Sequence, residues 1–268
     1  MQENLNSKLT IRIGRNTLSF TTQDATNMER PIAYEPYPVK AGISMAANLR
    51  EALKMNGARL RGHESTRVLI DTPSLIVPTE QFEPSEASAL FEYSYPAKEE
   101  KRVIAYNVLP SLKVVCLFAI NKDLRVVIGD NFGNAKFIHA MLPVWQHLHQ
   151  RSFTGNRSKL YGYFHGRQLD VFSFHMNRFK FCNAFDVTHP HDALYYLLHV
   201  WKQLRLEEVN DELHLAGDIP EREWLTQELG KFLRKTYIIN PEADFSHSAV
   251  SQITAMPYDL MTLLAKGR

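Results

Sequence analysis

The sequence predicts an α/β protein made of two similar halves, each a mixed β-sheet flanked by helices. A similar phrase opens each half: residues 8–20 and residues 159–174 both read as two strands joined at a Gly-Arg pair, Gly14-Arg15 and Gly166-Arg167. In both halves hairpin-like strands come first and strands alternating with helices follow, which favours mixed sheets. The second segment is longer than the first on each side of its turn. The prediction of two similar halves therefore depends more on the shared order of elements than on residue identity between the two segments.

Composition places the chain among ordinary globular proteins. Of its 268 residues, 44% are apolar and 22% are charged, and the net charge of +2 gives no field that would attract nucleic acid or an anionic membrane. Residues 1–7 lack an apolar leader, and the apolar run 114–120 is too short to cross a bilayer. We therefore expect a cytoplasmic protein without membrane insertion, whose Cys116 and Cys182 are buried thiols.

The first half begins with a hairpin over residues 8–22, in which Gly14 is expected to supply the positive φ of a tight turn. The prolines within residues 23–41 predict an irregular segment. Periodicity and turn residues then predict, in chain order, a helix at 44–56, strands at 67–71 and 75–78, a helix from 84, a strand at 103–108, a central strand at 114–120 that is apolar on both faces, a helix at 122–130, a strand at 135–139 and a helix at 140–151.

The second half follows a linker at 152–158 and starts with strands at 159–165, 168–175 and 178–185. In the third of these, Phe179, Phe181 and Phe185 are expected to share one face, with Arg178 and Lys180 on the other. The elements predicted next are a helix from Pro190, a strand at 212–216, a helix at 221–233, and strands at 236–239 and 248–254 before a helix after Pro257. We divide the chain into residues 1–156 and 157–268.

Three stretches carry a resemblance to a known family. They are the phenylalanines around Asn183-Ala184-Phe185, the helix at 192–196, and the strand and turn at 213–219. Together with the two-half order, they resemble the actin-like ATPase superfamily, a duplicated ribonuclease H-like fold, over essentially the whole chain. The details look closest to a bacterial family of unknown function with this fold. More distantly, the chain is similar to the cytoplasmic actin-like components of pilus-assembly and type II secretion machines.

The resemblance implies where a nucleotide would bind. Active members of the superfamily hold it in a cleft between the halves, and each hairpin carries an Asp-x-Gly loop whose carboxylate organises Mg²⁺ while backbone N–H groups cradle the phosphates. Here the hairpins read Arg12-Ile13-Gly14 and Phe164-His165-Gly166, so Arg12 and Phe164 stand where the acids would be. The Gly-Gly pair of the adenosine motif is Gly217-Asp218. Neither hairpin supplies a metal-binding carboxylate.

We therefore expect no conventional ATP hydrolysis, because metal neutralisation of charge is a main source of phosphoryl-transfer catalysis. No metal site or cofactor is predicted, and ATP with Mg²⁺ is the ligand to test. An alternative interpretation is that both Gly-Arg pairs are solvated hairpin turns. The candidate cleft or nucleotide-binding residues are Gly14, Arg15, Gly166, Arg167, Gly217 and Asp218.

Three functions remain open at this point. The first is a non-catalytic actin-like scaffold with a degenerate nucleotide site, whose cleft or outer face binds an unidentified protein partner. The second is a nucleotide-binding protein or slow ATPase with unusual metal ligands such as Asp170 or Asp186. The third is a nucleic-acid-associated factor, although the alternation at 178–181 is typical of a half-buried strand.

Other motifs point to no further chemistry. A metal site at the paired histidines 147–149 or 189–191 would need a third ligand in space, such as Asp186 or Asp192 for the second pair. Because no HxxxH pair or Cys partner is nearby, these histidines are interpreted as surface residues. The stretch 130–134 lacks the alternating acids of a calcium loop. The chain contains neither a P-loop nor a GxSxG nucleophile turn.

Overall fold

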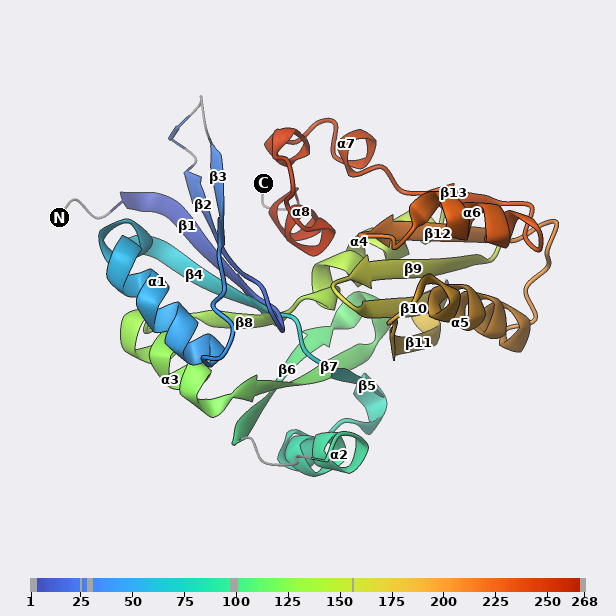
Figure 1. Cartoon of the computed structure of the whole chain (residues 1–268). Coiled ribbons are helices and arrows are strands. Elements are labelled where there is room, and N and C mark those ends of the chain that lie inside the picture. The colour runs from blue at the N-terminus through green and yellow to red at the C-terminus, as the bar shows by residue number, and fades with distance from the viewer. Residues whose placement is uncertain (1–3, 25, 28–30, 97–100, 156, 266–268) are drawn as a thin grey trace. The chain divides into compact units, whose positions relative to one another are not determined.

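The computed structural model describes residues 4–24, 26–27, 31–96, 101–155 and 157–265 (Figure 1). Its contacts group the chain into two compact units. The first unit comprises Met1–Leu109 and Val114–Leu142, and the second comprises Pro110–Lys113 and Pro143–Arg268. Residue 156, at which the sequence was divided, lies outside the described residues.

The first unit is built on a five-stranded mixed sheet with the order β3-β2-β1-β4-β8. Strand β1 pairs antiparallel with β2 and parallel with β4, β2 pairs antiparallel with β3, and β4 pairs parallel with β8. Helices α1 and α3 pack together on one side of it (Figure 1). The bounds are β1 Asn4–Ile13, β2 Leu18–Asp24, β3 Ile32–Tyr37, α1 Met45–Leu60, β4 His63–Ile70, α3 Lys122–Asn131 and β8 Lys136–His139.

Strand β3 lies within residues 23–41, so the expectation of an irregular segment there was wrong. Its Pro36 is opposite Ser19 of β2, and β3 is the outer strand of the sheet. An outer strand has one edge without a ladder, so a proline, which lacks an N–H, is tolerated there.

A three-stranded antiparallel sheet is inserted between β4 and β8, with the order β5-β7-β6. The strand β7 is central, as predicted. Its Val115 and Leu117 pack towards Phe91 of α2, and on its other face Cys116 and Phe118 are fully buried. The bounds are β5 Ser74–Pro78, η1 Thr79–Gln81, η2 Pro84–Glu86, α2 Ala87–Ser94, β6 Arg102–Leu109, η3 Pro110–Leu112 and β7 Val114–Asn121.

The second unit repeats the sheet of the first. Its strand order is β11-β10-β9-β12-β13, with antiparallel pairing among β9, β10 and β11 and parallel pairing of β9 with β12 and of β12 with β13. Two five-stranded sheets with one order and one pattern of directions confirm the predicted α/β fold class with duplicated mixed sheets. The bounds are α4 Met141–Ser152, β9 Lys159–His165, β10 Gln168–His175, β11 Arg178–Asp186, α5 Pro190–Gln203, β12 Glu212–Gly217, α6 Arg222–Gly230, β13 Thr236–Ile238, α7 Pro241–Asp244, η4 Ala249–Gln252 and α8 Tyr258–Ala265.

The two faces of the second sheet are covered differently. One packs against α5 and α6 in an apolar core that includes Phe164 and Trp201. The other carries aromatic rings: Tyr163 lies 5.9 Å from Tyr258 of α8, measured between ring centroids. This second face therefore mixes apolar packing with hydrogen-bonding groups, which need partners when they are buried.

A bulge in β11 changes which face its aromatic residues occupy. The pairing with β10 is irregular between Ser173 and Phe174, and Lys180 is the residue left over. Phe181 therefore packs into the core under α5, while Phe179 contacts Trp145 of α4 at 5.4 Å between centroids. The expectation that Phe179 and Phe181 share a face was wrong, because an extra residue reverses the alternation of side chains.

The C-terminal segment departs from the expected strand at 248–254. That stretch contains the 3₁₀ helix η4, whose Val250 is fully buried. The helix after Pro257 is present as α8.

Asp244 ties α4, α7 and α8 together. Its carboxylate accepts a hydrogen bond from the Tyr258 hydroxyl at 2.7 Å, lies 2.9 Å from His147 Nε2, and pairs with Arg151. Burial opposes its ionisation, but these partners outweigh burial and hold the pKa of Asp244 below its ordinary value.

We expect the stability that Asp244 contributes to be present above the ordinary aspartate pKa and to be lost as pH falls through the lowered pKa of the folded state. Urea unfolding of the wild type and of Asp244→Asn should therefore differ most near neutral pH and converge below about pH 4. Glu242→Gln, on the same short helix, is the matched control. A constant difference across this pH range would contradict the assignment.

Candidate functional site

The ends of β1 and β9 can be compared through the strands that pair with them. Ile13 is opposite Ile70, and the N–H of Asp71 donates to the Ile13 carbonyl at 2.9 Å. Phe164 is opposite Gly217, and the N–H of Asp218 donates to the Phe164 carbonyl at 3.0 Å. Ile13 and Phe164 are thus equivalent positions, which makes Tyr163, and not Phe164, the counterpart of Arg12.

Unequal turns explain this shift of one residue. The first hairpin has a four-residue turn, in which Gly14 N–H donates to the Thr17 carbonyl at 2.9 Å, whereas the second has two residues between His165 and Gln168. Gly166 has φ +57°, but Gly14 does not have a positive φ. The predicted role of Gly14 was therefore wrong. A Cβ at this position would lie 2.5 Å from Thr17 Oγ1, so lack of space is what favours glycine there.

Arg12 lies next to the last residue of β1, and its guanidinium group contacts two other side chains. Its side chain is 5% exposed, its Nη2 lies 3.1 Å from Asp71 Oδ2, and its Nη1 donates to Thr17 Oγ1 at 3.0 Å. The carboxylate that this sheet end does provide is therefore already neutralised by a guanidinium. A metal ion would have to displace a buried, hydrogen-bonded ion pair.

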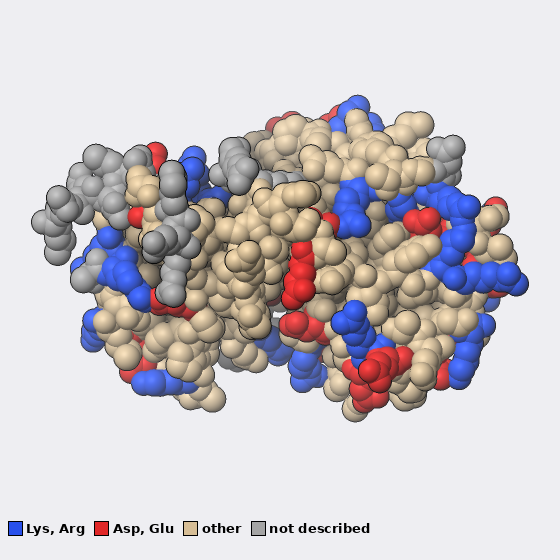
Figure 2. All heavy atoms as spheres, turned by 90° about the horizontal axis from the view of Figure 1, so that it is seen from above, with Lys and Arg blue, Asp and Glu red and all other residues tan. Residues whose placement is uncertain are grey.

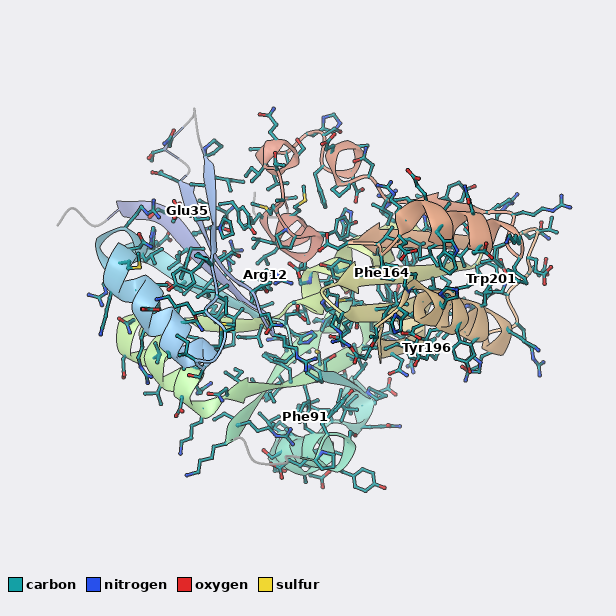
Figure 3. The ribbon with its side chains drawn as sticks, in the orientation of Figure 1. Arg12, Glu35, Phe91, Phe164, Tyr196 and Trp201 are labelled. Carbon is teal, nitrogen blue, oxygen red and sulfur yellow. The ribbon has the colours of Figure 1, made fainter. Side chains whose placement is uncertain are left out.

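The end of β9 is equally occupied. Phe164 is buried in the core with Trp201 of α5 (Figure 3). Tyr163 donates from its hydroxyl to Asp259 Oδ2 at 3.2 Å, and its ring stacks on His165 at 4.8 Å between centroids. Neither alignment of the two hairpins places a carboxylate at these positions, since Ile13 and Tyr163 are not acidic either.

The alternative metal ligands are also placed by the structure. Asp170 is 6% exposed and lies 2.5 Å from His165 Nε2, whereas Asp186 is exposed at the end of β11. Across the described part of the chain, no three His, Cys, Asp or Glu side chains are grouped so that they could hold a metal ion.

Gly217 has a structural reason to be glycine. Its φ is +86°, and a Cβ there would overlap the Phe164 carbonyl and lie 2.9 Å from the Tyr163 ring. Gly217 and Asp218 therefore lie against the end of β9, which leads directly into the turn formed by Gly166 and Arg167. Asp218 is exposed, as is Arg167, which donates to Thr188 Oγ1 at 2.8 Å.

Gly14 and Arg15 belong to the first unit, where Arg15 lines a hollow of about 290 Å³ next to the start of α1. Lys40 and the buried Asn48 line it too, and neither was predicted from the sequence. Asn48 accepts from the Lys40 N–H at 2.8 Å and so fixes the loop before the helix. Only the Ser44 cap of α1 signals this arrangement in the sequence.

Comparison of the sequence with known families settles its membership. Residues 1–236 match the family described as protein of unknown function (DUF3822). The chain belongs to the DUF3822 family. No curated protein gives a match to this DUF3822 chain.

Solved structures confirm the actin-like fold of this DUF3822 chain. A Bacteroides thetaiotaomicron protein with actin-like ATPase fold and unknown function is 26% identical, with a TM-score of 0.84 over 98% of each chain. A chain of the PilM–PilN type IV pilus biogenesis complex is 13% identical, with a TM-score of 0.54 over 96% of this chain and 97% of that one. The cytoplasmic domain of EpsL, from the type II secretion system of Vibrio cholerae, is 13% identical, with a TM-score of 0.41 over 84% and 95%.

Two surface properties of the DUF3822 chain bear on what it can bind. Both signs of charge are scattered among uncharged residues over the face drawn in Figure 2, and neither covers it continuously. Within the described residues, every helix is too short or too polar to span a bilayer.

Proposed function

We propose that this chain is a non-catalytic actin-like protein of the cytoplasm that acts as a scaffold or binds a partner protein, with a degenerate nucleotide site. The ion pair between Arg12 and Asp71 carries this proposal. It puts a fixed positive charge where the fold's ATPases place the carboxylate that organises Mg²⁺.

The energetic consequence is large. A bound metal ion contributes several kcal/mol to phosphoryl transfer by neutralising developing charge. A guanidinium in the same place repels a divalent cation, and at this sheet end Asp71 is engaged with Arg12. Tyr163, the equivalent residue on β9, donates a hydrogen bond to Asp259 and supplies no negative charge.

Partner binding is supported by analogy of fold alone. The PilM–PilN complex shows a chain of similar fold assembled with another protein. A fold retained without its catalytic carboxylates is consistent with use as a binding module, because function depends on sites carried by a fold and not on the fold itself.

A second candidate function is binding of a nucleotide or another phosphate without turnover. The hollow beside Arg15 and Lys40 favours it, because two cationic side chains line one cavity of about 290 Å³. However, Lys40 Nζ lies 2.7 Å from Glu51 Oε1, and this pairing compensates much of the positive charge. We therefore rank this function second.

Titration calorimetry with millimolar ATP and Mg²⁺ separates the two functions. We expect no saturable heat from the wild type. Saturable binding that Arg15→Glu abolishes and Arg167→Glu leaves intact would establish the nucleotide-binding function at this hollow. Gly217 is also a candidate site residue, but we do not substitute it in this test, because any side chain at that position would disturb β9.

Nucleic-acid binding is tested in the same way. With a net charge of +2 and mixed surface charge, we expect no retention on single- or double-stranded DNA or RNA at 0.15 M salt. Binding whose affinity falls steeply with added salt would favour the third function.

A further inference from the structure

One face of the sheet in the first unit carries a row of polar side chains that crosses its strands. Lys136 of β8 is beside Arg67 of β4, and Arg67 is beside Thr10 of β1. Thr10 is in turn opposite Thr21 of β2. Residues that are partners in register point to the same face of a sheet, so this row is continuous. The alternate residues of β1 are apolar and buried, and they belong to the opposite face.

The two threonines of this row have buried hydroxyl groups without partners. Thr10 and Thr21 are both 0% exposed, and within the described residues neither Oγ1 atom has a hydrogen-bond partner. A hydroxyl can donate one hydrogen bond and accept two, and leaving a buried hydroxyl unpaired is unfavourable. The two hydroxyls on facing strands therefore offer two donors to one ligand.

Arg67 adds a positive charge to this pair of hydroxyls. Its Nη2 donates to Gln23 Oε1 of β2 at 2.6 Å, so the side chain reaches from β4 across β1. Its Nε is buried without a hydrogen-bond partner. Burial lowers the pKa of Arg67, and no acidic neighbour acts in the opposite direction. A partly buried guanidinium without a counter-charge is unfavourable, and an anion beside it would relieve that cost.

The charges of the whole face favour an anion as the ligand. Among the described strand residues that point to it, none is aspartate or glutamate and four are lysine or arginine, namely Lys8, Arg12, Arg67 and Lys136. Arg12 is neutralised by Asp71 at the end of the sheet. Lys8 and Lys136 are exposed, and Arg67 is itself partly exposed, so the row can be reached from solvent.

We infer that Arg67, Thr10 and Thr21 bind a small organic carboxylate. The planar guanidinium matches the two oxygens of a carboxylate, and the two hydroxyls can donate to the same group. Because both threonines are fully buried, only a small group reaches them. Phosphate fits less well, since the backbone N–H groups that cradle phosphates elsewhere are engaged here in the sheet. With Lys8 and Lys136 nearby, a short dicarboxylate suits the face best.

Calorimetric titration of the full chain with succinate, at up to about 20 mM, tests the inference. We expect saturable binding by the wild type. Arg67→Gln should weaken it roughly tenfold or more, because charge-assisted hydrogen bonds are lost. Arg50→Gln makes the same change at an exposed position of α1, and this matched control should leave succinate binding unchanged.

Thr10→Val and Thr21→Val distinguish a binding role from a structural one. Valine has nearly the shape of threonine without its hydroxyl, so each variant should weaken succinate binding roughly two- to tenfold. The hydroxyl that is removed has no partner in the free protein, so neither variant should lower the thermal unfolding transition measured without succinate. Thr22→Val, on the opposite face of β2, is the control and should bind succinate as the wild type does.

Carboxylate binding goes beyond the proposed function and is independent of it, because it requires neither a nucleotide nor a partner protein. A wild type that shows no saturable binding of succinate would overturn the inference. Binding that Arg67→Gln and both valine variants leave unchanged would also overturn it. If Arg67→Gln does not fold, the valine variants alone decide. Inorganic phosphate that binds more tightly than succinate would overturn the assignment to a carboxylate.

Discussion

Replacing Gly217 with alanine is expected to lower the free energy of unfolding by about 2–5 kcal/mol. The left-handed backbone at φ +86° costs a residue with a Cβ about 1–2 kcal/mol, and forcing the methyl group against the Phe164 carbonyl adds an overpacking cost of about 1–3 kcal/mol. The two costs act together at the point where β12 meets β9. Urea unfolding followed by circular dichroism measures the loss.

Gly155→Ala is the matched control for Gly217→Ala. Its φ is +78°, yet nothing lies within 4 Å of the added Cβ, so only the backbone cost of about 1–2 kcal/mol remains. Equal losses for the two variants would show that the close approach of Gly217 to β9 has no energetic weight.

Arg12→Ala is expected to destabilise the chain by about 3–5 kcal/mol, because it leaves the carboxylate of Asp71 largely buried beside an empty space. The loss of stability comes from removing one partner of a desolvated ion pair, so removing the other partner should also lower the free energy of unfolding. Asp71→Ala should therefore be destabilising, and the double variant should cost less than the sum by about 0.5–3 kcal/mol.

Arg15→Ala serves as the control for Arg12, because Arg15 is the same residue type three positions further on and is exposed. We expect a change within about 0.5 kcal/mol for it. Additive effects of Arg12→Ala and Asp71→Ala would contradict the ion pair, since independent residues do not couple.

Much of the fold was predictable because hydrophobic patterns are local. The apolar run of β7 predicted a central strand, and the order of elements predicted the repeat. Strand β3 was missed because it contains Pro36. A proline argues against a strand that pairs with a neighbour on both sides, and the sequence does not show that β3 is an outer strand. The bulge at Lys180 was missed because one extra residue leaves the composition of β11 unchanged while reversing its faces.

The candidate site was less predictable, because it depends on distant pairs. The absence of acids at the two hairpins could be read from the sequence. That Arg12 neutralises Asp71, a residue far along the chain, could not, since no local pattern joins them. The equivalence of Arg12 with Tyr163 could not be predicted from the sequence either. The two turns differ in length, so aligning the two Gly-Arg pairs shifts β9 by one residue relative to β1.

Single-turnover hydrolysis of ATP tests the non-catalytic function most directly. The protein is held in excess over ATP with Mg²⁺ or Mn²⁺, and phosphate release is followed for hours. The ion pair of Arg12 with Asp71 predicts release at the protein-free rate for the wild type. Phosphate release well above the protein-free rate would contradict this prediction. If Arg167→Glu retained that release and a folded Asp71→Asn variant lost it, ATP hydrolysis would take place at the end of β1.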